Sequence, residues 1–128
     1  MYLIVTRSFP PELGGMQNLM WGLANSIAKY NLTKVFADYQ ENYQEFDDNV
    51  SFSIERIGGV KLLRKYRKAY LINEFIKKNK KIECIIADHW KSLELIKSFI
   101  KYAFLYFLNN FVPRILSIEN ETLPSNSW

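Results

Sequence analysis

Apolar residues recur along this chain with two alternating periods, one typical of helices and one typical of strands. The clearest helical period lies near the start, where apolar residues fall at i, i+3, i+4, i+7, i+8, i+11 and i+12. These residues are Met16, Leu19, Met20, Leu23, Ala24, Ile27 and Ala28. Two further helices are predicted over 61–79 and 91–110. The first of these is expected to turn inward Leu62, Tyr66, Ala69, either Ile72 or Asn73, and Ile76.

Short apolar or alternating runs predict strands over 2–6, 32–37, 50–57, 82–87 and 112–118, with a polar loop over 38–49. The run 82–87 is almost continuously apolar, as expected of a strand that helices cover on both faces. The order strand, helix, strand, strand, helix, strand, helix, strand predicts an α/β fold. We expect a Rossmann-like, mostly parallel sheet of about five strands with helices on both faces.

Polar residues follow three of these strands. The loop 8–15 follows the first strand, Asp38 follows the second, and Asp88, His89 and Trp90 follow the fourth. Because ligands of open parallel sheets bind outside the carboxyl ends of the strands, we expect these residues to meet at one ligand site. Each of these residues could instead have a structural role. His89 could be hydrogen-bonded scaffolding, Asp88 could cap a helix, and Trp90 could be part of the core.

A glycine pair, Gly14 and Gly15, separates the stiff Pro10–Pro11 segment from the first predicted helix. Without Cβ atoms the backbone can turn tightly and approach a ligand closely. The unpaired N–H groups of the helix start at the same place and suit a phosphate or a carboxylate. A plain strand-to-helix turn that needs glycine explains the pair equally well.

Composition and charge narrow the class of protein. The 128 residues are 48% hydrophobic, which indicates a single globular domain. The lone Cys84 excludes an internal disulfide and a cysteine-based zinc cluster. The segment 61–81 holds nine Lys or Arg residues against one acid, and its cations Lys61, Arg64, Lys65 and Lys68 share one helix face. That face is either solvated or contacts an anionic membrane; nucleic acid is not expected, because no recognition module is visible.

The N-terminal apolar run is short, lacks a basic segment before it, and is followed by Arg7 and Pro10, so it is not typical of a signal peptide. No stretch reaches the length of a membrane span. We therefore expect a cytoplasmic protein.

The stretch SFPPELGGMQNLMWGLANSIAKY resembles the opening of family 4 glycosyltransferases of the GT-B fold. The matching positions are Phe9-Pro10-Pro11, Gly14-Gly15, Gln17, Leu23-Ala24 and Ile27-Ala28. The segment IECIIADHWKSLELI is similar to that family's fourth-strand segment, and VPRILSIEN to the strand after it. The resemblance implies that 1–128 is one incomplete domain, part of the N-terminal half of a GT-B fold.

The resemblance also implies a function: transfer of a sugar from a nucleotide-sugar donor to a glycan or lipid-linked acceptor, at the cytoplasmic leaflet and without a metal or other cofactor. It implies donor-phosphate contacts at Gly14, Gly15 and Met16, and catalytic roles beside the transferred sugar for Asp88 and His89. It implies acceptor contacts at Pro11, Glu12, Gln17 and Trp90. Since the family's second domain supplies most donor contacts, we expect this chain alone to be inactive unless another domain or polypeptide completes the cleft.

Two departures from the family pattern concern histidine. Many members have a histidine at the position of Asp88, and many have one after the fifth strand, where this chain has Glu119-Asn120. Two other functions stay open. One is a non-catalytic α/β module that binds an anionic ligand or a partner chain. The other is a dinucleotide-binding domain with Asp38 facing a ribose, although LGGMQNL is not the expected G-x-G-x-x-G.

Overall fold

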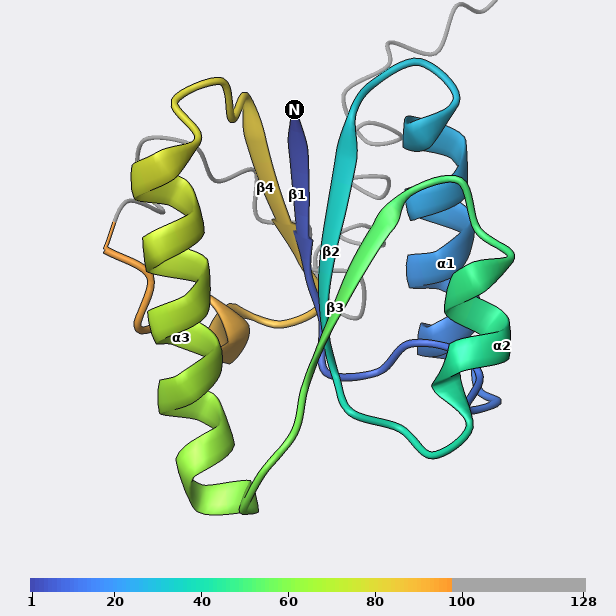
Figure 1. The fold of residues 1–128 in the computed structure, drawn as a ribbon, viewed down its shortest axis with the longest axis horizontal. Coiled ribbons are helices and arrows are strands. Elements are labelled where there is room, and N and C mark those ends of the chain that lie inside the picture. The colour runs from blue at the N-terminus through green and yellow to red at the C-terminus, as the bar shows by residue number, and fades with distance from the viewer. Residues whose placement is uncertain (98–128) are drawn as a thin grey trace, which may run out of the picture.

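The computed structural model describes residues 1–97, which form an α/β fold with a four-stranded, all-parallel sheet (Figure 1). The strands are β1 (Tyr2–Val5), β2 (Thr33–Asp38), β3 (Ser53–Ile57) and β4 (Cys84–Ala87). Their order in the sheet is β3-β2-β1-β4, so β1 lies in the interior. The predicted fold class is confirmed, with four strands described; the strand predicted over 112–118 lies outside the described residues.

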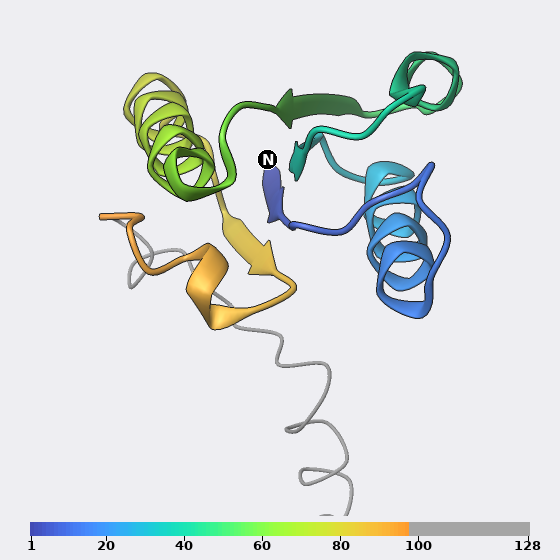
Figure 2. The same ribbon diagram turned by 90° about the horizontal axis from the view of Figure 1, so that it is seen from below.

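Helices cover both faces of this sheet (Figures 1 and 2). The helices α1 (Gly15–Ala28) and α2 (Tyr43–Asp48) lie on one side, and α3 (Lys61–Lys78) and the short 3₁₀ helix η1 (Trp90–Ser92) lie on the other. Within residues 1–97, no helix is long and apolar enough to cross a bilayer.

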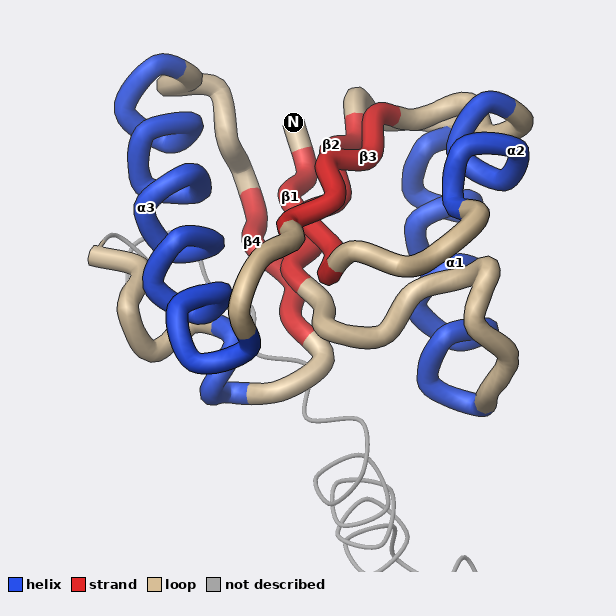
Figure 3. The backbone as a smooth tube through the Cα atoms, turned by 60° about the horizontal axis from the view of Figure 1, so that its bottom comes forward, coloured by secondary structure: helices blue, strands red, loops and turns tan. Residues whose placement is uncertain are grey.

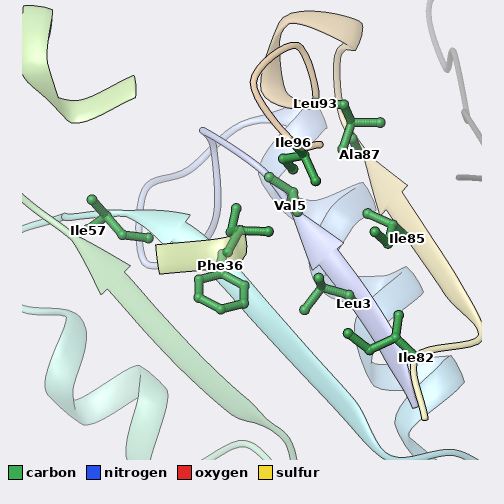
Figure 4. Packing of buried hydrophobic residues seen from close by; sticks show 10 residues of the cluster. Leu3, Val5, Phe36, Ile57, Ile82, Ile85, Ala87, Leu93 and Ile96 are labelled. Atoms are coloured by element: carbon green, nitrogen blue, oxygen red, sulfur yellow. The ribbon is translucent and has the colours of Figure 1, made fainter. Parts of the chain in front are cut away.

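Each strand contributes alternate side chains to two hydrophobic clusters, one on each face of the sheet. Leu3, Val5 and Phe36 pack with Ile72 of α3, and Figure 4 shows much of this cluster. Ile4, Val35 and Ala37 pack on the opposite face with Met20 and Ala24 of α1. Burial of both faces explains why the strands read as nearly continuous apolar runs.

Two predicted elements are wrong. The loop predicted over 38–49 contains α2, whose Phe46 ring lies 6.1 Å from the Phe9 ring. The helix predicted from residue 91 is replaced, as far as residue 97, by η1 and turns. Asn73 of α3 explains this change, because its side chain donates to the Leu95 carbonyl and accepts from the Lys97 N–H, both at 3.0 Å. The rest of that predicted helix lies beyond the described residues.

The inward face of α3 is also rotated from its predicted position. Ala69 and Ile72 are buried as predicted, but Leu62 is 82% exposed and Tyr66 is 62% exposed. Lys68 takes a buried position instead. Burial of a lysine requires a partner for its charge, and the partners of Lys68 come from strand ends far away in the sequence.

Candidate functional site

The carboxyl ends of β1, β2 and β4 bring the predicted polar residues together at one edge of the sheet, where the loops leave the strands in Figure 3. Lys68 of α3 joins two of these strand ends, because its ammonium donates to the Thr6 carbonyl at 2.5 Å and to Asp38 at 2.8 Å. Thr6 in turn donates from its hydroxyl to Asp88 at 3.0 Å. The ends of β1, β2 and β4 therefore meet as predicted, through Thr6, Asp38 and Asp88. The loop 8–15 is predicted at the same ligand site, but none of its residues lines the pocket beside Lys68.

The carboxylate of Asp88 accepts hydrogen bonds on both oxygens. Oδ2 lies 3.0 Å from the Thr6 hydroxyl and 3.0 Å from the Arg7 N–H, and Oδ1 lies 2.8 Å from the Ser92 hydroxyl. These bonds tie the end of β1 to η1. With both oxygens occupied, Asp88 is suited to hold its neighbours and to supply a fixed negative charge.

His89, and not Asp88, caps the element that follows β4. Its Nδ1 accepts from the Lys91 N–H at 3.1 Å, which leaves Nε2 as the second ring nitrogen for a ligand. The neighbouring Trp90 is 45% exposed, so its alternative role as a core residue is wrong. The His89 and Trp90 rings lie 6.0 Å apart at an angle of 31°.

A pocket of about 240 Å³ opens between α3, η1 and the ends of β1 and β2. Six of the described residues that line it are basic and one is acidic. The lining residues are Arg7, Asp38, Lys61, Arg64, Lys65, Lys68, Ala69, Lys91 and Ser92. The four α3 cations predicted to share a face do line this one pocket. Lys68 is only 5% exposed, however, so the solvated face predicted for all four is wrong at that position.

Acidic side chains balance only part of this charge. Asp38 lies 2.8 Å from the Lys68 ammonium and 3.6 Å from the Arg64 guanidinium. Lys65 pairs with Glu94 at 2.6 Å. The three other cations, Arg7, Lys61 and Lys91, form no ion pair with any residue in the range 1–97. The pocket is therefore strongly positive.

The environment of Lys68 perturbs its protonation. Burial lowers the pKa of Lys68, the Asp38 carboxylate opposes this shift, and the Arg7 guanidinium adds to it. Asp38 is thus occupied by cations of α3, which leaves it poorly placed to bind the ribose of a dinucleotide.

The glycine pair lies at the start of α1, and neither glycine lines the basic pocket. Helix α1 lies on the opposite side of the sheet from α3 (Figure 2). Gly14 has extended backbone with φ of 166°, and neither glycine adopts the left-handed conformation that would demand glycine. A Cβ on Gly14 would lie 2.2 Å from the side chain of Gln17, whereas a Cβ on Gly15 would meet nothing within 4 Å. No side chain among the described residues caps α1.

Three other predicted site residues lie around this loop. Glu12 accepts from the Gln40 side chain at 2.9 Å, and Met16 is half-buried against the α1-side cluster. The carbonyl of Pro10, next to Pro11, accepts from the Arg56 guanidinium. None of the predicted donor or acceptor contacts in this loop lines the basic pocket.

Sequence reasoning missed Arg7, Lys91 and Arg56. Arg7 and Lys91 complete the basic pocket. The feature of the sequence that could have identified them is that each closely follows the end of a strand. Arg56 is only 3% exposed and holds Asp47 through two bonds of 2.7 and 3.1 Å. The sequence indicates burial of Arg56 by placing it on the apolar side of the alternating run 50–57.

Among residues 1–97, no group of three or more His, Cys, Asp or Glu side chains is arranged to hold a metal ion. Comparison with protein-family models, with curated proteins and with solved structures gives no match to this chain. What the site binds must be inferred from its own residues.

Proposed function

We propose that this chain is the N-terminal, acceptor-side domain of a glycosyltransferase that moves a sugar from a nucleotide-sugar donor to a glycan or lipid-linked acceptor. The main support is the arrangement of the β1–α1 unit. The FPP-x-x-GG segment leads from an interior strand into a helix without a side-chain cap, at the carboxyl edge where Asp88 and His89 also lie. A helix start of this kind suits the donor diphosphate.

In this proposal the backbone N–H groups of Gly15 and Met16 face the donor phosphates. Trp90, with almost half of its surface exposed, stacks on a sugar ring of the acceptor. His89 uses Nε2 toward the acceptor hydroxyl, while Asp88 supplies a fixed negative charge beside the transferred sugar. A domain beyond this chain supplies most donor contacts, and we expect no transfer by these 128 residues alone.

The test is a nuclear magnetic resonance titration of the chain with UDP and GDP, with NAD as the comparison ligand. We expect millimolar binding that shifts the amide signals of 15–17. Gly15→Trp should abolish these shifts, because the indole would occupy the space before α1. Gly22→Trp is the matched control: a Cβ at Gly22 also meets nothing within 4 Å, but Gly22 lies in the middle of the same helix. Equal shifts in both variants, or an equal response to NAD, would contradict the proposal.

A second candidate is a non-catalytic module that binds an anionic ligand or a partner chain. The observation that favours it is the Asp88 carboxylate, whose oxygens are already taken by Thr6, Arg7 and Ser92. A carboxylate held in this way joins the end of β1 to η1, which is a structural role. Binding of a simple anion with no nucleotide response at α1 would favour this candidate.

We also propose that the domain works in the cytoplasm, in peripheral contact with the inner face of a membrane. The exposed side of α3 carries Leu62, Leu63, Tyr66 and Tyr70, each more than 60% exposed, beside Lys61 and Lys65. Apolar and aromatic side chains flanked by cations suit an anionic bilayer surface. Lys68 takes no part, since it is buried.

Vesicle co-sedimentation tests this contact. Leu62→Ser/Tyr66→Ser should weaken binding to phosphatidylglycerol vesicles about tenfold or more, since burying one leucine is worth about 1.5 kcal/mol or more. Tyr30→Ser/Leu32→Ser is the control pair, because both of its residues are 70% exposed or more and lie outside α3. Equal losses in the two double variants would show that the α3 side is not the membrane face.

A further inference from the structure

We infer that the basic pocket between α3 and η1 binds the terminal phosphate of a small phosphate monoester. This site is distinct from the start of α1, and the inference does not depend on sugar transfer. The charges of the pocket, a guanidinium fixed in its wall, its preformed walls and its size lead to this ligand class.

The first argument is uncompensated charge. Arg7, Lys61 and Lys91 line the pocket and have no acidic partner among residues 1–97. Cations held close together repel one another, and a bound anion removes that repulsion while gaining charge-assisted hydrogen bonds. With six basic residues against Asp38, a doubly charged ligand fits better than a singly charged one.

The second argument is a guanidinium fixed in the wall of the pocket. The guanidinium of Arg64 is fixed by the Gly59 carbonyl at 3.1 Å and by Asp38 at 3.6 Å. Asp38 is the only carboxylate beside Arg64 in the described part of the chain, and it also pairs with Lys68. Arg64 therefore holds a fixed guanidinium in the wall whose charge is only partly balanced.

The third argument is that both walls are held in place without a ligand. On the α3 side, Lys68 is anchored by the Thr6 carbonyl and Asp38. On the η1 side, the Ser92 hydroxyl donates to Asp88 and the Lys91 N–H donates to His89. A preformed site loses little ordering entropy on binding, which favours a small ligand with few contacts.

Size and valence select the class of anion. The volume of about 240 Å³ lies below the range of about 300–1,000 Å³ typical of pockets for drug-sized ligands, so the ligand is small. A phosphate monoester loses its second proton near pH 6 and is largely a dianion at pH 7. A phosphodiester carries only one charge, and each phosphate in the diphosphate bridge of a nucleotide sugar likewise carries one.

Calorimetry on the 128-residue chain, with ribose 5-phosphate and inorganic phosphate as probes, tests this inference. We expect both to bind at pH 7.5 and dimethyl phosphate to bind at least tenfold more weakly. Affinity for ribose 5-phosphate should fall about tenfold between pH 7.5 and pH 5, as the second proton returns to the phosphate. Equal binding of dimethyl phosphate, or affinity that does not change with pH, would overturn the assignment.

Two triple variants distinguish binding in the pocket from a general effect of the net charge of the protein. Arg7→Gln/Lys61→Gln/Lys91→Gln should weaken ribose 5-phosphate binding at least tenfold. The control Lys29→Gln/Lys78→Gln/Lys80→Gln removes the same charge outside the pocket and should change affinity by less than about twofold at 0.15 M salt. Equal losses would mean that only net charge matters. Circular dichroism checks that each variant folds, and amide shifts at Arg7 and Ser92, but not at 15–17, distinguish this site from the start of α1.

Discussion

Arg56 and Lys68 are two buried cations that have different roles in this fold. Each is held by a carboxylate and a backbone carbonyl: Arg56 by Asp47 and Pro10, and Lys68 by Asp38 and Thr6. Around Arg56 the charges balance, and the rings of Phe9 and Tyr43 lie against the guanidinium. Around Lys68 more cations gather and a pocket opens.

The comparison shows that the neighbours of a buried ion pair, more than the pair itself, decide what it does. A balanced and enclosed pair fastens two segments, as Arg56 fastens the Pro10 segment and α2 to β3. A pair whose carboxylate is shared with Arg64 leaves positive charge for a ligand. Three predictions test this difference, from the largest expected effect to the smallest.

Arg56→Met should lower the free energy of unfolding by about 3 kcal/mol, measured by urea denaturation, because Asp47 would keep a charge without its partner. The double variant Arg56→Met/Asp47→Leu should recover most of this loss. Lys34→Met is the control, since its pair with Glu55 at 3.4 Å is partly exposed and weak. A loss as small as that of the control would mean that Arg56 does not fasten these segments.

Lys68→Met should lower the free energy of unfolding by a smaller amount, about 1–2 kcal/mol at pH 7. Arg64 still faces Asp38 in this variant, and the repulsion between Lys68 and Arg7 disappears. Burial lowers the pKa of Lys68 in the folded chain below the ordinary lysine value of 10.5. Between these two values the unfolded chain binds more protons, so the free energy of unfolding gains a contribution that rises with pH.

The Lys68→Met variant lacks that contribution. The difference in the free energy of unfolding between the wild-type chain and the variant should therefore grow as pH rises toward 10.5. Urea denaturation at pH 7.5 and 9.5 measures it. A difference that shrinks with rising pH would mean that the charged form of Lys68 is favoured in the fold.

The smallest effect is expected from the pocket rim. Arg7→Gln/Lys61→Gln/Lys91→Gln should raise the melting temperature slightly at low salt, because it removes repulsion without breaking an ion pair among the described residues. The gain should vanish in 1 M NaCl, where charges are screened within about 3 Å. A lower melting temperature in the variant would show that these cations have structural partners.

Much of the fold could be predicted from the sequence because the information is local. The apolar run at the start of β1 and the helical period of 16–28 lie within a few residues of one another, and each pattern fixes its own element. The same applies to the strand ends: once the sheet is known to be parallel, Asp38 and Asp88 must lie at the same edge.

The rest depended on contacts between distant residues. The orientation of α3 is set by Lys68, whose partners Asp38 and Thr6 lie 30 and 62 residues away along the chain. Periodicity treats a lysine as a surface residue, so it assigned Leu62 and Tyr66 to the core. The turns near residue 95 depend in the same way on Asn73, 22 residues earlier.

The interior position of β1 has a consequence during synthesis on the ribosome. β1 can pair with β2 as soon as residue 38 has emerged, but its other edge has no partner until β4 follows, on the order of 80 residues after β1. At about 5–20 residues per second this edge stays open for several seconds. An exposed apolar edge invites pairing with other chains, so the nascent protein should depend on chaperones most strongly before residue 87 is made.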